Sequence, residues 1–179
     1  MASLQRLAFS GAMLQRGFWL YVWEIETAKG DKWLYVGRTG DSSSLNAQSP
    51  FNRLSQHLGS NKHANALRRH LAKVGVVPEQ CSQFQMFAYG PLHPEAETRE
   101  GHWSSRDKCA SLENAVRDAL HLAGYKVLNE VHCRQRTNAD DWDEVFKVFA
   151  GHFPELITAI VAVEKRNDEL PVDGKGLGH

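Results

Sequence analysis

Cysteine is scarce in this chain of 179 residues, which has three, and none of them stands in a CxxC pair. An odd number of cysteines without paired spacing argues against a disulfide framework. The spacing of Cys and His is not typical of a structural zinc site either. Unpaired cysteines are typical of a reducing compartment, so we expect a cytoplasmic protein.

Long apolar runs are also missing. No segment approaches the roughly 20 consecutive apolar residues that a membrane-spanning helix needs, so we expect no membrane partner. The stretch GRTGD at 37–41 lacks the lysine and the spacing of a phosphate-binding P-loop. A hydrophobic fraction of 42% and a charged fraction of 23% are ordinary for a globular chain, and the length favours one compact domain.

Acidic residues are absent from positions 42–78, although the formal net charge of the whole chain is zero. The same segment carries basic side chains and histidines, which are Arg53, Lys62, Arg68, Arg69, Lys73, His57, His63 and His70. A one-sided distribution of this kind attracts phosphates locally. The alternative is an ordinary solvated helix face. We favour the phosphate-facing interpretation because the acid-free segment is long.

The hydrophobic pattern predicts an α/β fold with a small, mixed, partly antiparallel sheet of three strands flanked by helices. Strands are expected at 18–26 and 33–37, joined as a hairpin, and at 83–89. Ser49 and Pro50 suit the start of a helix that ends at Gly59. Further helices are expected at 64–74, at 111–123 and from position 140 onward. Residues 93–108 are expected to be irregular, and 125–128 to return as a short strand.

Two tyrosine-containing motifs lie on the predicted hairpin, one reading WLY at 19–21 and the other YVG at 35–37. Together they resemble the paired motifs that name the GIY-YIG nuclease superfamily, although the first departs from the family at its glycine. Residues of the expected types follow in the family's order, namely Arg38, Arg53, His57, Glu113 and Asn129. The segment between Gly37 and Arg53 is longer than in compact members, a feature of the restriction-enzyme-like branch.

The resemblance implies a division of the chain. Residues 17–135 would form a GIY-YIG-like nuclease domain, preceded by an N-terminal extension at 1–16. Residues 136–169 would form a helical extension packed on the same domain, and 170–179 a flexible tail. The C-terminal helices would pack on the core, mediate a homodimer or mask the basic surface, and the sequence does not choose among these.

The resemblance also implies a role for each matched side chain. Glu113 would bind one Mg²⁺ or Mn²⁺, because a single carboxylate can hold such an ion while waters and substrate oxygens complete the shell. Arg53 and His57 are four residues apart and share one face of a helix, where the arginine would grip a phosphate. Gly37 would let substrate or another backbone approach closely. Asn129 would hold the glutamate or the strand ends by hydrogen bonds.

Tyr21 and Tyr35 would take part in proton transfer. A tyrosine pKa near 10 must fall before the phenol can act as a base at neutral pH, and we expect Arg38, Arg53 and a bound metal to lower it. By resemblance, Tyr21 is the proton acceptor and Tyr35 positions the phosphate or the water. The unknown register of the hairpin leaves these two roles exchangeable.

The sequence therefore predicts a metal-dependent endonuclease that hydrolyses DNA, with RNA as an alternative substrate. The basic segment would add non-specific backbone contacts through Lys62, Arg68, Arg69 and Lys73, which implies strong salt dependence. A second hypothesis is a catalytically inactive nucleic-acid-binding module of the same fold. A third is a structural or interaction domain. The complete set of matched site residues favours the enzyme.

Overall fold

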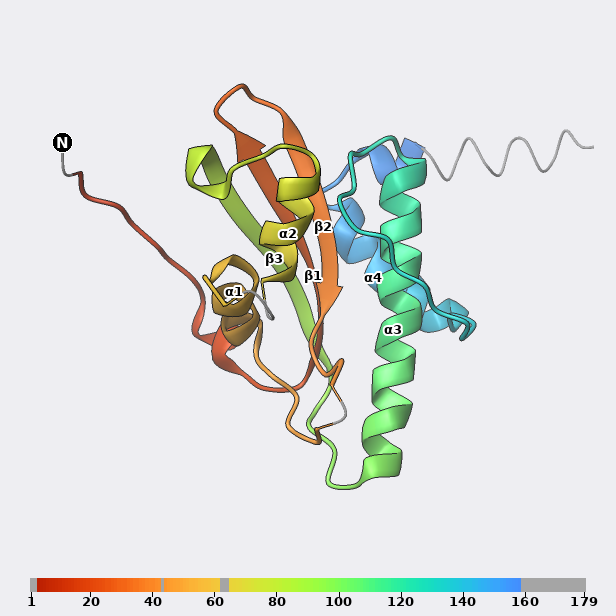
Figure 1. Cartoon of the computed structure of the whole chain (residues 1–179). Coiled ribbons are helices and arrows are strands. Elements are labelled where there is room, and N and C mark those ends of the chain that lie inside the picture. The colour runs from red at the N-terminus through yellow and green to blue at the C-terminus, as the bar shows by residue number, and fades with distance from the viewer. Residues whose placement is uncertain (1–2, 43, 62–64, 159–179) are drawn as a thin grey trace, which may run out of the picture.

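The computed structural model describes residues 3–42, 44–61 and 65–158, and it contains a three-stranded sheet between two layers of helices (Figure 1). The small α/β class expected from the sequence is confirmed. The strands are β1 (Phe18–Thr27), β2 (Lys32–Arg38) and β3 (Cys81–His93). The helices are α1 (Pro50–Leu58), α2 (Ala66–Lys73), α3 (Arg99–Leu122) and α4 (Ala139–Ala150), with short 3-10 helices η1 (Gly11–Leu14) and η2 (Pro78–Gln80).

The strand order is β2-β1-β3, and both pairings with the central β1 are antiparallel. In the β1–β2 hairpin Tyr21 lies opposite Gly37 and Trp23 lies opposite Tyr35. Residues opposite each other, and residues two apart on one strand, share a face of the sheet. The register therefore places Tyr21 and Tyr35 on the same face, which the sequence alone could not decide.

Each face of the sheet has its own hydrophobic cluster. Phe18, Leu20 and Val22 of β1 face the layer of α3 and α4, where they join Val116, Leu120 and Phe149. Tyr21, Trp23 and Ile25 face the opposite layer, where they join Leu67 and Leu71 of α2. Figure 1 shows α1 and α2 on one side of the sheet and α3 and α4 on the other. The alternation along β1 thus assigns the tyrosines to the α1–α2 side.

Helix α1 begins and ends where its sequence signals predict. The Ser49 hydroxyl accepts a hydrogen bond from the Asn52 N–H at 3.2 Å, Pro50 occupies the first turn, and Gly59 follows the last residue. A serine N-cap satisfies one of the backbone N–H groups that the first turn leaves without a partner. The ends of the helix that carries Arg53 and His57 are therefore set by local capping.

The expectation of an irregular segment at 93–108 is wrong. Strand β3 continues to His93, and α3 begins at Arg99 after Thr98, whose hydroxyl accepts a hydrogen bond from the Gly101 N–H at 3.2 Å. His102 and Cys109 are completely buried, so the apolar stripe expected for 111–123 extends upstream along one longer helix. The glycine and serines suggested a loop, but capping and burial decide the conformation here.

The C-terminal part of the described chain belongs to the same core. Helix α4 starts after Asn138, whose side-chain oxygen accepts hydrogen bonds from the N–H groups of Asp140 and Asp141. Its Val145 and Phe149 are buried in the cluster that also holds β1 and α3. The helix expected after Pro154 can be followed only to position 158, and the expected tail lies outside the described residues. Within the described ranges, no helix has the length and apolarity needed to cross a membrane.

Asn129 fastens the outer edge of β2. Its Oδ1 accepts a hydrogen bond from the Val36 N–H at 3.0 Å, and its Nδ2 donates to the Val36 carbonyl at 2.8 Å. Next to it, the Leu128 N–H donates to the Leu34 carbonyl at 2.8 Å, and Leu34 forms an isolated parallel bridge with Val127. The segment expected as a strand at 125–128 thus forms only this bridge. Asn129 holds the strand backbone and not the glutamate.

Replacing Asn129 with Asp tests this fastening. The change keeps the acceptor for the Val36 N–H but places a carboxylate oxygen against the Val36 carbonyl, so a buried acceptor loses its donor. We expect the free energy of unfolding to fall by about 2–3 kcal/mol. The same change at exposed Asn52 of α1 should alter it by less than about 0.5 kcal/mol. Urea unfolding of both variants is the measurement, and equal effects would contradict the role of Asn129.

Candidate active site

The residues matched by the sequence analysis come together around the C-terminal end of β2. Strands β1 and β2 supply Tyr21, Tyr35, Gly37 and Arg38, helix α1 supplies Arg53 and His57, and helix α3 supplies Glu113. Tyrosines and α1 side chains lie on one face of the sheet, while Arg38 pairs with Leu20 and so faces α3. The site therefore spans both faces at the end of an edge strand.

Tyr21 and His57 form a hydrogen-bonded pair in the interior. The Tyr21 hydroxyl and the His57 Nε2 are 2.6 Å apart, and the two side chains belong to residues that are 0% and 3% exposed. Tyr35 packs against the same imidazole, with ring centroids 5.1 Å apart. His57 is therefore the centre around which both tyrosines are arranged.

Gly37 is required because the Tyr21 ring crosses it. A Cβ atom at position 37 would lie 2.4 Å from Cε2 and 2.6 Å from the hydroxyl oxygen of Tyr21, closer than real contacts allow. We expected Gly37 to admit substrate or another backbone, and this expectation is wrong. The space that the missing side chain leaves is taken by the phenol of its cross-strand neighbour.

Arg53 joins the two halves of the site. Its Nη2 donates to the carbonyl of Arg38 at 3.3 Å and to the carboxylate of Asp41 at 2.5 Å, and its Nη1 donates to Gln56 at 3.2 Å. The first of these bonds reaches the last residue of β2 from helix α1. The guanidinium group is thus fixed by the backbone on one side and by a loop carboxylate on the other.

Arg38 and Glu113 form an ion pair on the α3 side, with 2.8 Å between Nε and Oε2. Both side chains are largely buried, at 15% and 14% exposure. Burial raises the pKa of Glu113 to about 6, and the charge of Asp41 adds to the increase, while Arg38 and Arg53 oppose it. The carboxylate is therefore ionised at neutral pH but near the threshold of protonation.

Three polar nitrogens around this site are buried and have no hydrogen-bond partner among the described residues: Arg38 Nη1, Arg53 Nε and His57 Nδ1. Unsatisfied buried donors cost free energy and are rare in folded proteins. Two of the three are guanidinium N–H groups, which can only donate. Their common requirement is an acceptor, and an oxyanion supplies several acceptor atoms at once.

Contrary to expectation, the neighbouring arginines do not bring the pKa of either tyrosine below its ordinary value. Burial raises the pKa of Tyr35 to about 12 and that of Tyr21 still further above its ordinary value. The charge of Arg53 acts in the opposite direction on both phenols but does not overcome burial, and Glu113 adds to the increase. Both tyrosines are therefore protonated at neutral pH.

His57 is uncharged at neutral pH. Burial lowers its pKa to about 4, and the nearby charge of Arg53 lowers it further. A neutral imidazole has one donor and one acceptor nitrogen. Because Tyr21 is protonated and can donate, Nε2 accepts this bond, and the ring proton resides on Nδ1. His57 is accordingly a basic acceptor that both tyrosines contact directly.

The predicted DNA contacts of the basic segment fall into different groups. Lys62 lies outside the described residues. Arg68 is already engaged, since it pairs with Glu79 at 2.7 Å and donates to the Leu58 carbonyl. Arg69 and Lys73 are exposed and form no ion pair within the described ranges. The charge of Arg69 also lowers the pKa of Tyr35, which places this arginine near the site.

Two residues that lie at the site had no role predicted from the sequence. Asp41 contacts Arg53, and His102 of α3 lies 2.9 Å from the Ser42 carbonyl through Nε2. The signal for Asp41 was available, because it is the last acidic residue before the acid-free segment. His102 carried no such signal, since it fell in the segment expected to be irregular.

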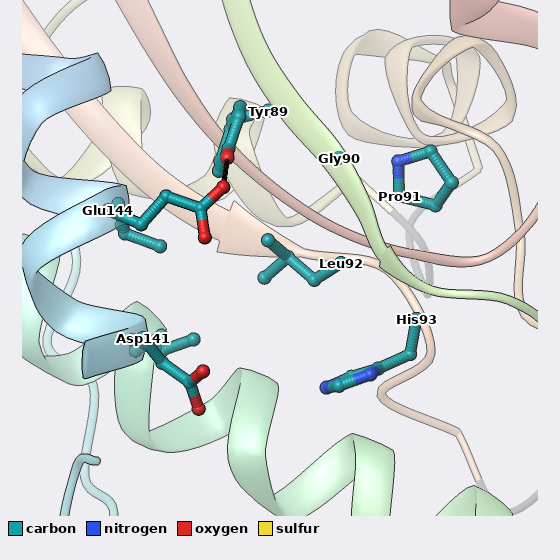
Figure 2. Close-up of a pocket in the computed structure, with 9 residues that line it drawn as sticks. Tyr89, Gly90, Pro91, Leu92, His93, Asp141 and Glu144 are labelled. Atoms are coloured by element: carbon teal, nitrogen blue, oxygen red, sulfur yellow. Dashed lines mark hydrogen bonds between the residues drawn. The ribbon is translucent and has the colours of Figure 1, made fainter. Parts of the chain in front are cut away.

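A separate cavity of about 230 Å³ lies between the end of β3 and α4 (Figure 2). Figure 2 shows Tyr89 and His93 on the strand side, facing Asp141 and Glu144 of α4. The Tyr89 hydroxyl donates to Glu144, so part of this acidic wall is already bonded. None of the matched residues lines the cavity, which opens on the α4 side of the sheet.

The donor set for a metal ion is small. Within the described part of the chain, no three His, Cys, Asp or Glu side chains cluster in a way that could hold a metal. Glu113 could hold one hard divalent cation through a carboxylate oxygen, since Mg²⁺ keeps several waters and is commonly bound through one or two carboxylates.

No family model, curated protein or solved structure matches the chain.

Substituting Gly37 with Ala tests the arrangement of Tyr21. The new Cβ must displace the phenol ring, which is fully buried, so we expect a loss of about 1–3 kcal/mol in the free energy of unfolding. The hydrogen bond to His57 should be disturbed as well. Gly11→Ala is the matched control, because no atom lies within 4 Å of the Cβ it adds. Unfolding and near-ultraviolet circular dichroism compare the two, and an unperturbed Gly37→Ala protein would contradict the packing.

Proposed function

We propose that this protein is a metal-dependent endonuclease that hydrolyses DNA phosphodiester bonds, with a site of the GIY-YIG type. The observation that carries the proposal is that three kinds of group lie at one site. Arg38 and Arg53 each have a buried N–H donor without a partner among the described residues, which suits an oxyanion. The carboxylate of Glu113 suits a cation, and the Tyr21–His57 pair suits a proton transfer.

The two arginines support a phosphodiester as the substrate group. A phosphate offers several oxygens to guanidinium N–H groups, and charge accumulates on these oxygens in the transition state. Donors held rigidly before the reaction stabilise that charge without reorganisation. Arg53 meets this condition, because the Arg38 carbonyl and Gln56 fix its guanidinium group.

Glu113 is the side chain that would hold Mg²⁺ or Mn²⁺. One carboxylate has room for a second interaction while it accepts a hydrogen bond from Arg38, since its two oxygens offer about four acceptor positions. A divalent ion bound there supplies Lewis-acid stabilisation of a phosphate oxygen. The neighbouring guanidinium counteracts the effect of burial on the pKa of Glu113, so the carboxylate is ionised at neutral pH, which is the form that binds a cation.

The Tyr21–His57 pair supports a relay of protons. A phenol with a raised pKa is a poor base by itself, but a phenol that gives its proton to an imidazole can accept one from water at the same time. The 2.6 Å contact between the hydroxyl and Nε2 suits such a transfer. We therefore assign His57 as the final proton acceptor and Tyr21 as the group that relays the proton of the attacking water. Tyr35 positions the imidazole by packing on it.

Cleavage of supercoiled plasmid DNA in the presence of Mg²⁺ or Mn²⁺ tests this function. Arg53→Gln and Glu113→Gln should each reduce the nicking rate by at least about 100-fold, because each removes a charge from the transition state. The matched controls are Arg99→Gln and Glu100→Gln, which change the charge of exposed residues at the start of α3, away from the site, and should stay within about threefold of the unmodified protein.

Two outcomes would contradict the nuclease. One is nicking that survives both site substitutions, which would point to a contaminant. The other is DNA binding without cleavage at any metal concentration, unaffected by Glu113→Gln. That result would favour the second hypothesis, a nucleic-acid-binding module that has the fold without turnover.

The pH dependence of cleavage tests the role of Glu113. Its pKa of about 6 means that the carboxylate loses its charge, and so its affinity for the cation, as the pH falls through 6. At Mg²⁺ concentrations below saturation we expect the rate to fall tenfold per pH unit below about 6 and to be level above it. If protonation of His57 alone set the pH dependence, the cleavage rate would fall only near pH 4. Activity that stays level down to pH 5 would contradict the assignment.

A further inference from the structure

Asp41 is held over Arg53 by anchors on both sides of it in the chain. On one side, the buried Thr39 hydroxyl donates to the Gly17 carbonyl. On the other, His102 Nε2 lies 2.9 Å from the Ser42 carbonyl. Gly40 between them has φ of +71°, and a Cβ there would lie 2.4 Å from the Phe18 ring. The backbone of this turn is therefore fixed, and the carboxylate of Asp41 is aimed at the arginine.

The contact between Asp41 and Arg53 is incomplete as a guanidinium–anion pair. Asp41 Oδ2 accepts from Nη2 at 2.5 Å, whereas the neighbouring Nε of Arg53 is buried and has no partner among the described residues. A guanidinium fork matches an anion best through two parallel N–H···O bonds. A single Asp41 oxygen thus occupies a place on Arg53 where an anion could accept two hydrogen bonds.

Exposure shows which partner can leave. The Asp41 side chain is 42% exposed and that of Arg53 is 18% exposed. A rotation of the Asp41 side chain would release its carboxylate into solvent without moving the anchored backbone. Arg53 has no equivalent freedom, since the Arg38 carbonyl and Gln56 also hold it. The carboxylate is consequently the exchangeable member of the pair.

We propose that Asp41 is an internal competitor that occupies, in the free protein, the place on Arg53 that a backbone phosphate of a nucleic acid takes. The inference rests on the proposed function in taking a nucleic acid as the ligand, but it concerns binding and not cleavage. Binding then exchanges one anion for another on the same guanidinium group. Asp41 lowers the affinity of the protein for the phosphate backbone of any nucleic acid, whatever its sequence. Only a ligand that displaces Asp41 then occupies the site.

The test is the affinity for a fluorescein-labelled DNA duplex of random sequence, measured by anisotropy at fixed ionic strength with EDTA present, so that no metal-dependent cleavage occurs. Asp41→Asn removes the competing charge and should tighten binding by about fivefold. Asp31→Asn is the matched control, because it also removes one partner of an exposed ion pair, with Lys126 at 3.0 Å. This control should change the affinity by less than about twofold.

A double substitution shows whether the gain acts through the arginine. In an Arg53→Gln background, Asp41→Asn should tighten binding by no more than the Asp31→Asn control does, because no guanidinium remains to be released. An equal gain in both backgrounds would overturn the inference in favour of a general charge effect. Weaker binding by Asp41→Asn would overturn it too, since it would make Asp41 a positioning residue for Arg53.

The inference and the proposed function fail in different ways. Tighter binding by Asp41→Asn without cleavage by any variant supports the competitor and contradicts the nuclease. Cleavage together with unchanged affinity in Asp41→Asn supports the nuclease and contradicts the competitor. An absence of duplex binding by every variant also contradicts the competitor, because the inference requires Arg53 to accept a backbone phosphate.

Discussion

The phenol of Tyr21 crosses the backbone of Gly37, its partner in the β1–β2 hairpin, and this contact determines how the site is built. With no side chain at position 37, the ring can occupy the space over this glycine and bring its hydroxyl to 2.6 Å from His57. Any larger residue would push the phenol away from the imidazole. The glycine and the tyrosine of the two motifs are therefore one structural unit, although they lie on different strands.

The charges of the site are balanced within the free protein. Glu113 neutralises Arg38, and Asp41 neutralises Arg53, so two cations meet two carboxylates at the end of β2. Burial opposes ionisation of the carboxylate and of both phenols, as the raised pKa values of Glu113, Tyr35 and Tyr21 indicate. An arrangement of this kind can admit a phosphate and a cation together without a large change in net charge.

Elements could be predicted from the sequence where a local motif, such as a helix cap, coincides with burial. Ser49, Pro50 and Gly59 locate α1 because capping depends on residues a few positions apart. The two motif tyrosines lie on neighbouring strands as expected. The length of α3 could not be predicted, because its first turns combine a glycine and serines with a buried histidine that packs against Phe18. Nor could the tyrosine pKa values, since these depend on how deeply the hairpin is covered from both sides.

The long segment after β2 also had no explanation in the sequence. In the structure it carries Asp41 to Arg53, and His102 holds the neighbouring carbonyl of Ser42 from the far layer. Contacts between residues 60 positions apart follow from tertiary packing and leave no periodic trace in the chain. The misplaced start of α3 therefore has a tertiary cause. Asp41 is different, because it contacts an arginine only 12 positions away and is the last acidic residue before the acid-free segment.

The most direct test of the account is to locate bound Mn²⁺ by its anomalous scattering in crystals of the protein. A manganese ion is expected on the carboxylate of Glu113, beside Arg38. Manganese bound at the acidic wall formed by Asp141 and Glu144, with none at Glu113, would contradict it.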